Sequence, residues 1–205
     1  MAAQSKRDIE TLEKELEERN FIFMRDVSNS KHYVKWVCRK DQGDMLLKIV
    51  DKRLLYLNQE IKQAFIREFQ VGKRVGGAWQ HLAAFFDFFY LKNHAVIVYE
   101  YYSKGTLEEN IQIKNSYEYN EALVVSNDLI RGLEELKLLG LIHKNLDAGC
   151  VYLGQSCLKI GGFEFCEFSE NNSHRTDANR NFSYNFPTLR SLNLFFNGKR
   201  VSWAA

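Results

Sequence analysis

The first hundred residues of the chain contain short β-rich runs that are interrupted once by a helical pattern. The runs cover residues 21–23, 33–38, 45–50, 83–90 and 95–101. Between the third and fourth runs, apolar side chains of residues 58–75 recur every three or four positions, and Gly76-Gly77 ends the pattern. The sequence therefore predicts an antiparallel sheet of five strands with one inserted helix.

A mainly helical part follows this predicted sheet. Residues 107–113 and 121–139 have helical spacing, and Gly140 ends the second segment. Two short β-rich runs at 151–153 and 158–160 flank a turn and predict a small hairpin. Together the two parts predict an α+β fold.

The segment from Ser5 to Glu18 carries Ile9, Leu12 and Leu16 on one side of a predicted amphipathic helix. Such a stripe packs on the domain that follows it or docks on another protein subunit. Both interpretations are open at this stage.

Composition and charge exclude several classes of protein. The 205 residues are 45% hydrophobic and 26% charged, which is typical of a globular chain, and the formal net charge is only +2. This charge provides no basic field for nucleic acid or an anionic membrane surface, and no apolar stretch has the length of a membrane span. The four cysteines lack metal-ligand spacing, so we expect reduced thiols in a cytoplasmic protein.

The order of elements and two charged residues resemble a eukaryotic protein kinase domain. Leu46-Leu47-Lys48-Ile49 resembles the third-strand motif whose lysine holds the nucleotide phosphates, and Arg67-Glu68 resembles the helix glutamate that pairs with this lysine. Twenty residues separate Lys48 and Glu68. This spacing suits the end of a strand, a connection and a few turns of helix. The resemblance implies a complete five-stranded small lobe followed by a truncated, mainly helical large lobe.

Residues 98–107 resemble the segment that joins the two lobes of such a domain. Tyr99 stands at the gatekeeper position, and Glu100 to Tyr102 stand at the hinge, whose backbone faces an adenine in this family. The resemblance therefore implies a remnant nucleotide site formed by Lys48, Glu68, Glu100 and Tyr102.

The positions that carry the family's chemistry are altered. Leu141 to Leu146 stand where the catalytic loop belongs, and there Asn145 replaces the catalytic aspartate and Asp147 the loop lysine. Cys150 replaces the asparagine that binds magnesium, and Gly162 replaces the second magnesium ligand, the aspartate of the DFG motif. The resemblance thus implies a degenerate pseudokinase with no catalytic base, no metal site and no enzymatic activity.

The phosphate-covering loop is altered as well. Val27, Asn29 and His32 stand where the family has three glycines, and residues 25–40 contain no glycine in any register. We therefore expect no bound cofactor and favour a structural ion pair for Lys48 and Glu68 over metal-free contact with ATP. His143 is expected to be a packed structural histidine.

The predicted domain organisation has four parts. These are an amphipathic helix (1–20), a small lobe with hinge (21–102), a partial large lobe with the degenerate catalytic loop (103–170) and an aromatic tail (171–205) in which residues 188–196 resemble a remnant large-lobe helix. The residues after Phe163 are too few for the remaining large-lobe helices.

The predicted function is that of a scaffold or structural subunit in a larger assembly, cytoskeletal or of another kind. We expect other protein subunits to bind through residues 171–205 and the N-terminal helix. The alternative is a nucleotide-binding regulator that controls a true kinase or another enzyme.

Overall fold

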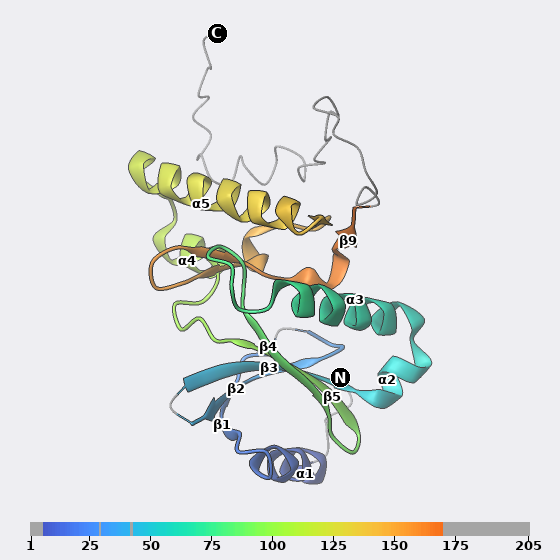
Figure 1. Ribbon diagram of the computed structural model, residues 1–205. Helices are drawn as coiled ribbons and strands as arrows, with labels where there is room; N and C mark the ends of the chain where they lie inside the picture. Colours follow the sequence, from blue (N-terminus) through green and yellow to red (C-terminus); the bar gives the residue numbers. More distant parts are fainter. Residues whose placement is uncertain (1–5, 29, 42, 170–205) are drawn as a thin grey trace. The chain divides into compact units, whose positions relative to one another are not determined.

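The computed structural model describes residues 6–28, 30–41 and 43–169, and it divides the chain into two compact units (Figure 1). Unit 1 contains the chain up to Ala78 together with Ala84–Tyr101. Unit 2 contains Trp79–Ala83 and the chain from Tyr102 onward. Trp79–Ala83 follows the predicted helix in the chain, yet it belongs to unit 2. The predicted small lobe, residues 21–102, was one continuous segment and did not include this exchange. The predicted tail, 171–205, lies outside the described residues.

Unit 1 is built on a five-stranded antiparallel sheet in the order β1-β2-β3-β5-β4. The strands are β1 (Ile22–Asp26), β2 (Val34–Lys40), β3 (Gly43–Asp51), β4 (Phe85–Tyr90) and β5 (His94–Glu100). The helices of this unit are α1 (Lys6–Glu17), α2 (Lys52–Leu57) and α3 (Gln59–Val75). The predicted sheet and its inserted helix are therefore confirmed, and α2 is an additional short helix.

Helix α1 packs against one face of the sheet. Leu12 and Leu16 are buried in one cluster with Phe21, Trp36 and Leu47, and Ile9 packs against the same cluster. A partner could bind through this stripe only if its leucines were exposed. The structure therefore shows the intramolecular alternative, in which the stripe packs on the sheet of unit 1.

Helix α3 packs against the other face. The side chain of Asn58 caps it by accepting hydrogen bonds from the backbone N–H groups of Glu60 and Ile61. On its inner side, Gly72 lies so close to β4 that an added Cβ would be 2.5 Å from the ring of Phe85. This close approach places Glu68, one turn before Gly72, over the middle of the sheet.

The described residues of unit 2 form two α-helices and two short antiparallel strand pairs. The helices are α4 (Leu107–Lys114) and α5 (Tyr119–Leu138), close to the predicted ranges. The strand pairs are β6 (Leu141–Ile142) with β9 (Glu167–Phe168) and β7 (Val151–Leu153) with β8 (Leu158–Ile160), and the single-turn helices are η1 (Ala148–Cys150) and η2 (Phe163–Phe165). The pairing of β6 with β9 was not predicted, because strands of two residues have no readable periodicity.

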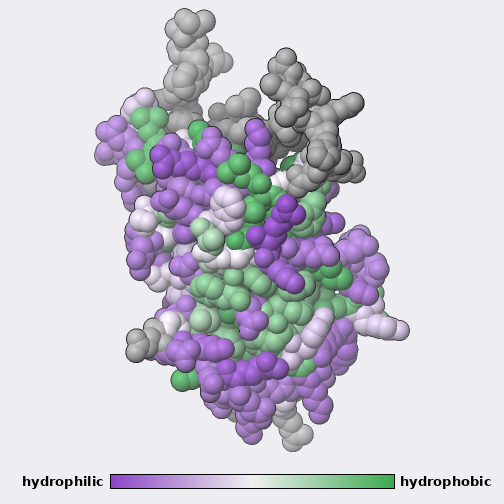
Figure 2. All heavy atoms as spheres, viewed as in Figure 1, coloured by the Kyte–Doolittle hydropathy of each residue, from purple (hydrophilic) through white to green (hydrophobic). Residues whose placement is uncertain are grey.

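The surface of unit 1 is not uniform in polarity. Figure 2 shows mostly hydrophilic residues at the end occupied by α1 and a paler apolar area near β4. Phe86 and Tyr90 of β4 are exposed. Among the described residues, no helix is long and apolar enough to span a membrane.

Candidate functional site

Lys48 and Glu68 form a buried ion pair inside unit 1. The strand β3 places Lys48 on the sheet face that α3 covers, and its Nζ lies 2.5 Å from Oε2 of Glu68. The two side chains are only 6% and 5% exposed. The hydroxyl of Tyr99, at the gatekeeper position, donates a hydrogen bond of 2.9 Å to the other carboxylate oxygen of Glu68. The pair thus has the hydrogen bonds that a buried charge requires.

Tyr33 covers the lysine from the loop that precedes β2. Its ring centroid lies 4.1 Å from Nζ of Lys48 and 5.6 Å from Nζ of Lys35, so the ring contacts two cations. The sequence analysis did not single out Tyr33. The available signal was the alternation of β2, which puts Tyr33, Lys35 and Val37 on one face of the sheet.

The β1–β2 loop is held by its own polar contacts. The N–H of Val27 donates to the carbonyl of Lys35, and the hydroxyl of Ser28 accepts the N–H of Lys35. Val27 and His32 are exposed in this loop, and Asn29 lies outside the described residues. No glycine allows the backbone to approach a phosphate here, in agreement with the altered motif.

A second contact lies on the same sheet, between β1 and the residue that follows β5. The guanidinium of Arg25 donates a hydrogen bond to the hydroxyl of Tyr101 and lies 5.5 Å from its ring centroid. Because β2 and β3 lie between these two chain segments in the sheet, the two side chains reach across both strands.

The remaining hinge positions belong to different units. Glu100 is the last residue of β5, and its N–H donates to the carbonyl of Ala84 in unit 1. Tyr102 is buried in unit 2, where its ring stacks on Tyr152 with centroids 5.4 Å apart. The structure brings Lys48 and Glu68 together, whereas Tyr102 is used for packing in unit 2.

His143 is a packed histidine, as expected. It is buried, and its Nε2 lies 2.7 Å from the carbonyl oxygen of Gly161, so this nitrogen carries the proton and donates it. Its Nδ1 has no hydrogen-bond partner. Burial lowers the pKa of His143, because the charged ring would lose its water without gaining a second acceptor.

The two altered residues of the catalytic loop have different environments. Asn145 is exposed. Asp147 also lies at the surface, but its carboxylate accepts a hydrogen bond of 2.9 Å from the backbone N–H of Cys150 and thereby caps η1. Asp147 is therefore a structural cap, which sequence reasoning missed because the single turn it caps has no sequence pattern of its own.

Cys150 and Gly162, the two positions for which the resemblance implies magnesium ligands, lie against each other. A Cβ on Gly162 would lie 2.6 Å from Sγ of Cys150, and Gly162 has a left-handed backbone with φ of 71°. Burial, reinforced by nearby Asp147, raises the pKa of Cys150 to about 12, so the sulfur is a protonated thiol. A thiol is a poor ligand for Mg²⁺, which prefers oxygen, and the described residues contain no group of three side chains suited to a metal ion.

Comparison with known families gives a match over most of the chain. The model of the protein kinase domain matches residues 30–189, a range that contains Lys48, Glu68, Cys150 and Gly162. This is more than half of the chain, so the protein belongs to the protein kinase domain family. A search of curated proteins finds no match.

Proposed function

We propose that the chain is a pseudokinase, which performs no phosphoryl transfer and acts as a scaffold or structural subunit by binding other proteins. The observation that carries this proposal is the contact between Cys150 and Gly162. Phosphoryl transfer requires metal ions that neutralise the developing charge, and these two positions offer a thiol and a bare backbone. In addition, Asn145 carries an amide at the position where the resemblance implies a catalytic carboxylate, and an amide cannot accept the proton of a substrate hydroxyl.

The lysine region supports the same proposal. Lys48 is paired with Glu68 and lies against the ring of Tyr33. A nucleotide phosphate would have to displace Tyr33 and compete with a buried carboxylate, without magnesium to neutralise its own charge. The pair is therefore better suited to fastening α3 to the sheet than to holding ATP.

Phosphotransfer is tested with the full chain, γ-labelled ATP, and Mg²⁺ or Mn²⁺. We expect no label in the chain or in a mixture of generic protein substrates. Labelling that disappears in Lys48→Ala would overturn the proposal. An active protein kinase assayed in parallel shows that the conditions support transfer.

The scaffold role is tested by the size of the native protein. We expect the endogenous chain to elute from size exclusion in a stoichiometric complex much larger than its own 24.0 kDa. Subunits would bind through residues 171–205 or the outer side of α1, in a cytoplasmic assembly that is cytoskeletal or of another kind. Elution as a monomer from cells that express it would contradict the role.

The regulator alternative is kept because the Lys48–Glu68 pair is intact. It predicts that ATP raises the melting temperature of the chain in the absence of metal. Under the scaffold proposal, ATP leaves the melting temperature unchanged with or without Mg²⁺.

A further inference from the structure

Strand β4 combines an aromatic sequence with an outer position in the sheet. Five of the six residues from Phe85 to Tyr90 are aromatic, and Asp87 is the only charged residue among them. The strand is the last in the order β1-β2-β3-β5-β4, so it pairs with β5 on one side only. Short segments with strong β propensity and little charge pair readily with a strand of another chain when they lie at an edge. A second copy of the chain can therefore add to β4 unless this edge is closed.

The hydrogen bond in the β4–β5 turn shows which backbone groups of β4 point away from β5. The N–H of Leu91 donates to the carbonyl of His94, so these two residues bond to each other across the turn. In an antiparallel pair, such residues alternate with residues whose N–H and C=O groups point to the other side. Tyr90 and Phe88 lie one and three residues before Leu91, with no register shift between them. Their backbone groups therefore line the outer edge of the sheet.

A carboxylate occupies the outward N–H of Phe88. Oδ1 of Asp87 accepts this N–H at 2.7 Å. Asp87 is exposed, so its negative charge also lies at the edge. An approaching strand would have to displace the carboxylate before it could bond to the donor. A register shift between Phe85 and Asp87 also interrupts the regular edge at the start of the strand.

An arginine occupies the outward carbonyl of Tyr90. The guanidinium of Arg19 donates to this oxygen at 3.3 Å and lies 4.6 Å from the ring centroid of Phe89. Arg19 follows helix α1, and Glu15 of this helix accepts the N–H of Lys92 in the β4–β5 turn at 3.0 Å. The N-terminal helix thus holds the end of β4 and places a cation at its edge.

A second cation, Lys52, binds the turn that follows β4. Its Nζ lies 2.5 Å from the carbonyl oxygen of Leu91 and 3.1 Å from that of Lys92. The same Nζ is 5.0 Å from the ring centroid of Tyr90. Charged side chains therefore follow the edge from Asp87 to the turn, as on natural edge strands that are protected from pairing.

We propose that Asp87 and Arg19 close the outer edge of β4, so that a second copy of the chain cannot add a strand there. Each of the two side chains bonds to one outward backbone group and brings a charge to an otherwise aromatic edge. The contact that they prevent is an antiparallel β4–β4 pair, because two copies would meet through the same edge. The closed edge is independent of the scaffold role, since a partner that binds elsewhere leaves it unchanged.

Self-association of the purified full chain tests the proposal. Asp87→Ala combined with Arg19→Ala uncovers both backbone groups, and sedimentation should give a mean mass at least about twice that of the natural chain at the same concentration. Glu134→Ala with Arg131→Ala removes the same two charges from exposed positions of α5 and is the matched control. A first variant that sediments like the natural chain, or a control that associates equally, would overturn the proposal.

A proline identifies the surface through which the double variant associates. Tyr90→Pro removes an outward N–H without removing a bond between β4 and β5. Added to the double variant, it should return the mean mass to that of the natural chain. Tyr90→Ala removes the ring and keeps the N–H, so it should leave the association in place. Association that persists after Tyr90→Pro would lie elsewhere on the chain and contradict the proposal.

Hydrogen exchange tests the carboxylate without the double variant. In Asp87→Ala, the amide of Phe88 should exchange about tenfold faster than in the natural chain, because it loses its acceptor. The amide of Leu91, which donates to the carbonyl of His94, is the internal control and should keep its rate. Asp87→Asn retains an acceptor oxygen and should preserve the slow exchange of Phe88. Equal rates for Phe88 in the natural chain and Asp87→Ala would show that Asp87 does not close the edge.

Discussion

The sulfur of Cys150 occupies the space that any side chain at position 162 would need, because a Cβ on Gly162 would lie 2.6 Å from it. The two residues therefore form a complementary pair. Replacing either one with the residue typical of the kinase family would not rebuild a metal site, since the other still blocks it or lacks the required oxygen. The packing of Cys150 thus fills the space beside Gly162.

This pairing predicts non-additive stability. Gly162→Ala should destabilise the chain by the cost of a left-handed alanine, roughly 1–2 kcal/mol, and by the overlap with Cys150. In a Cys150→Ala background the overlap with sulfur disappears, so the same substitution should cost less. Urea unfolding of the four chains measures the coupling. Gly77→Ala, where an added Cβ meets no atom within 4 Å, is the control. Equal costs in both backgrounds would show that the thiol does not fill this space.

The buried ion pair predicts a large effect of removing one partner. Lys48→Met leaves the carboxylate of Glu68 buried without its cation, which should cost about 3–5 kcal/mol. Lys48→Met combined with Glu68→Leu should recover most of this loss, because it removes the isolated charge. The exposed Lys62→Met is the matched control, expected within about 0.5 kcal/mol of the natural chain. If Lys48→Met were as mild as the control, the pair would not fasten α3 to the sheet.

The N-terminal helix is predicted to be part of the folded unit. Leu16→Ala should cost about 2–5 kcal/mol, since the leucine is fully buried in the cluster around Phe21. Leu57→Ala removes the same atoms at a position that is 78% exposed and should change stability little. Chemical denaturation of both variants makes the comparison. A neutral Leu16→Ala would indicate that the helix is not anchored in this way.

Because the pKa of His143 is lowered, we expect acid to destabilise the protein. Burial lowers its pKa in the folded state, so the unfolded chain binds more protons as the pH falls below the usual histidine range. Stability should therefore be present at neutral pH and decrease towards pH 5. His143→Gln retains a donor for the carbonyl of Gly161 and should reduce this decrease, as measured by thermal melts across the range. His94, whose pKa is also lowered by burial, should account for part of the remaining slope. If the melting temperature of His143→Gln fell with pH as steeply as that of the natural chain, other groups would cause the acid sensitivity.

Much of the fold was accessible from sequence periodicity. The five strands, α3 and α5 follow from alternation and helical spacing, and the twenty residues between Lys48 and Glu68 suit a pair that joins β3 to α3. The ion pair was predicted because its partners stand at recognisable positions of these elements. Tyr33 was missed, since a contact between a loop residue and the middle of β3 depends on how the loop closes over the sheet.

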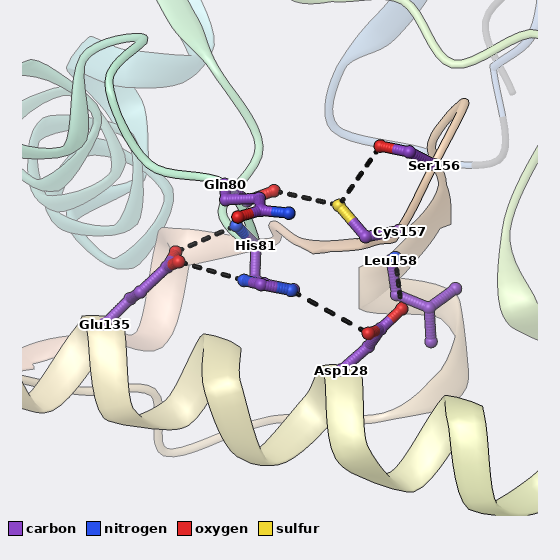
Figure 3. A network of polar contacts seen from close by, with 7 residues as sticks. All are labelled: Gln80, His81, Asp128, Glu135, Ser156, Cys157 and Leu158. Carbon is purple, nitrogen blue, oxygen red and sulfur yellow. Dashed lines mark hydrogen bonds and ion pairs between the residues drawn. The ribbon is translucent and has the colours of Figure 1, made fainter.

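The sequence by itself determined the family and the α+β architecture and predicted the loss of the usual catalytic residues, because these depend on residue types in a given order. Only the tertiary structure decided that the stripe of α1 is buried, that Asp147 is a cap, that Cys150 fills the space beside Gly162 and that His81 lies between Asp128 and Glu135 (Figure 3). Most of these contacts join residues of separate elements, and the cap by Asp147 closes a single turn. Their geometry is set by the packing of whole elements, which local patterns of polarity do not encode.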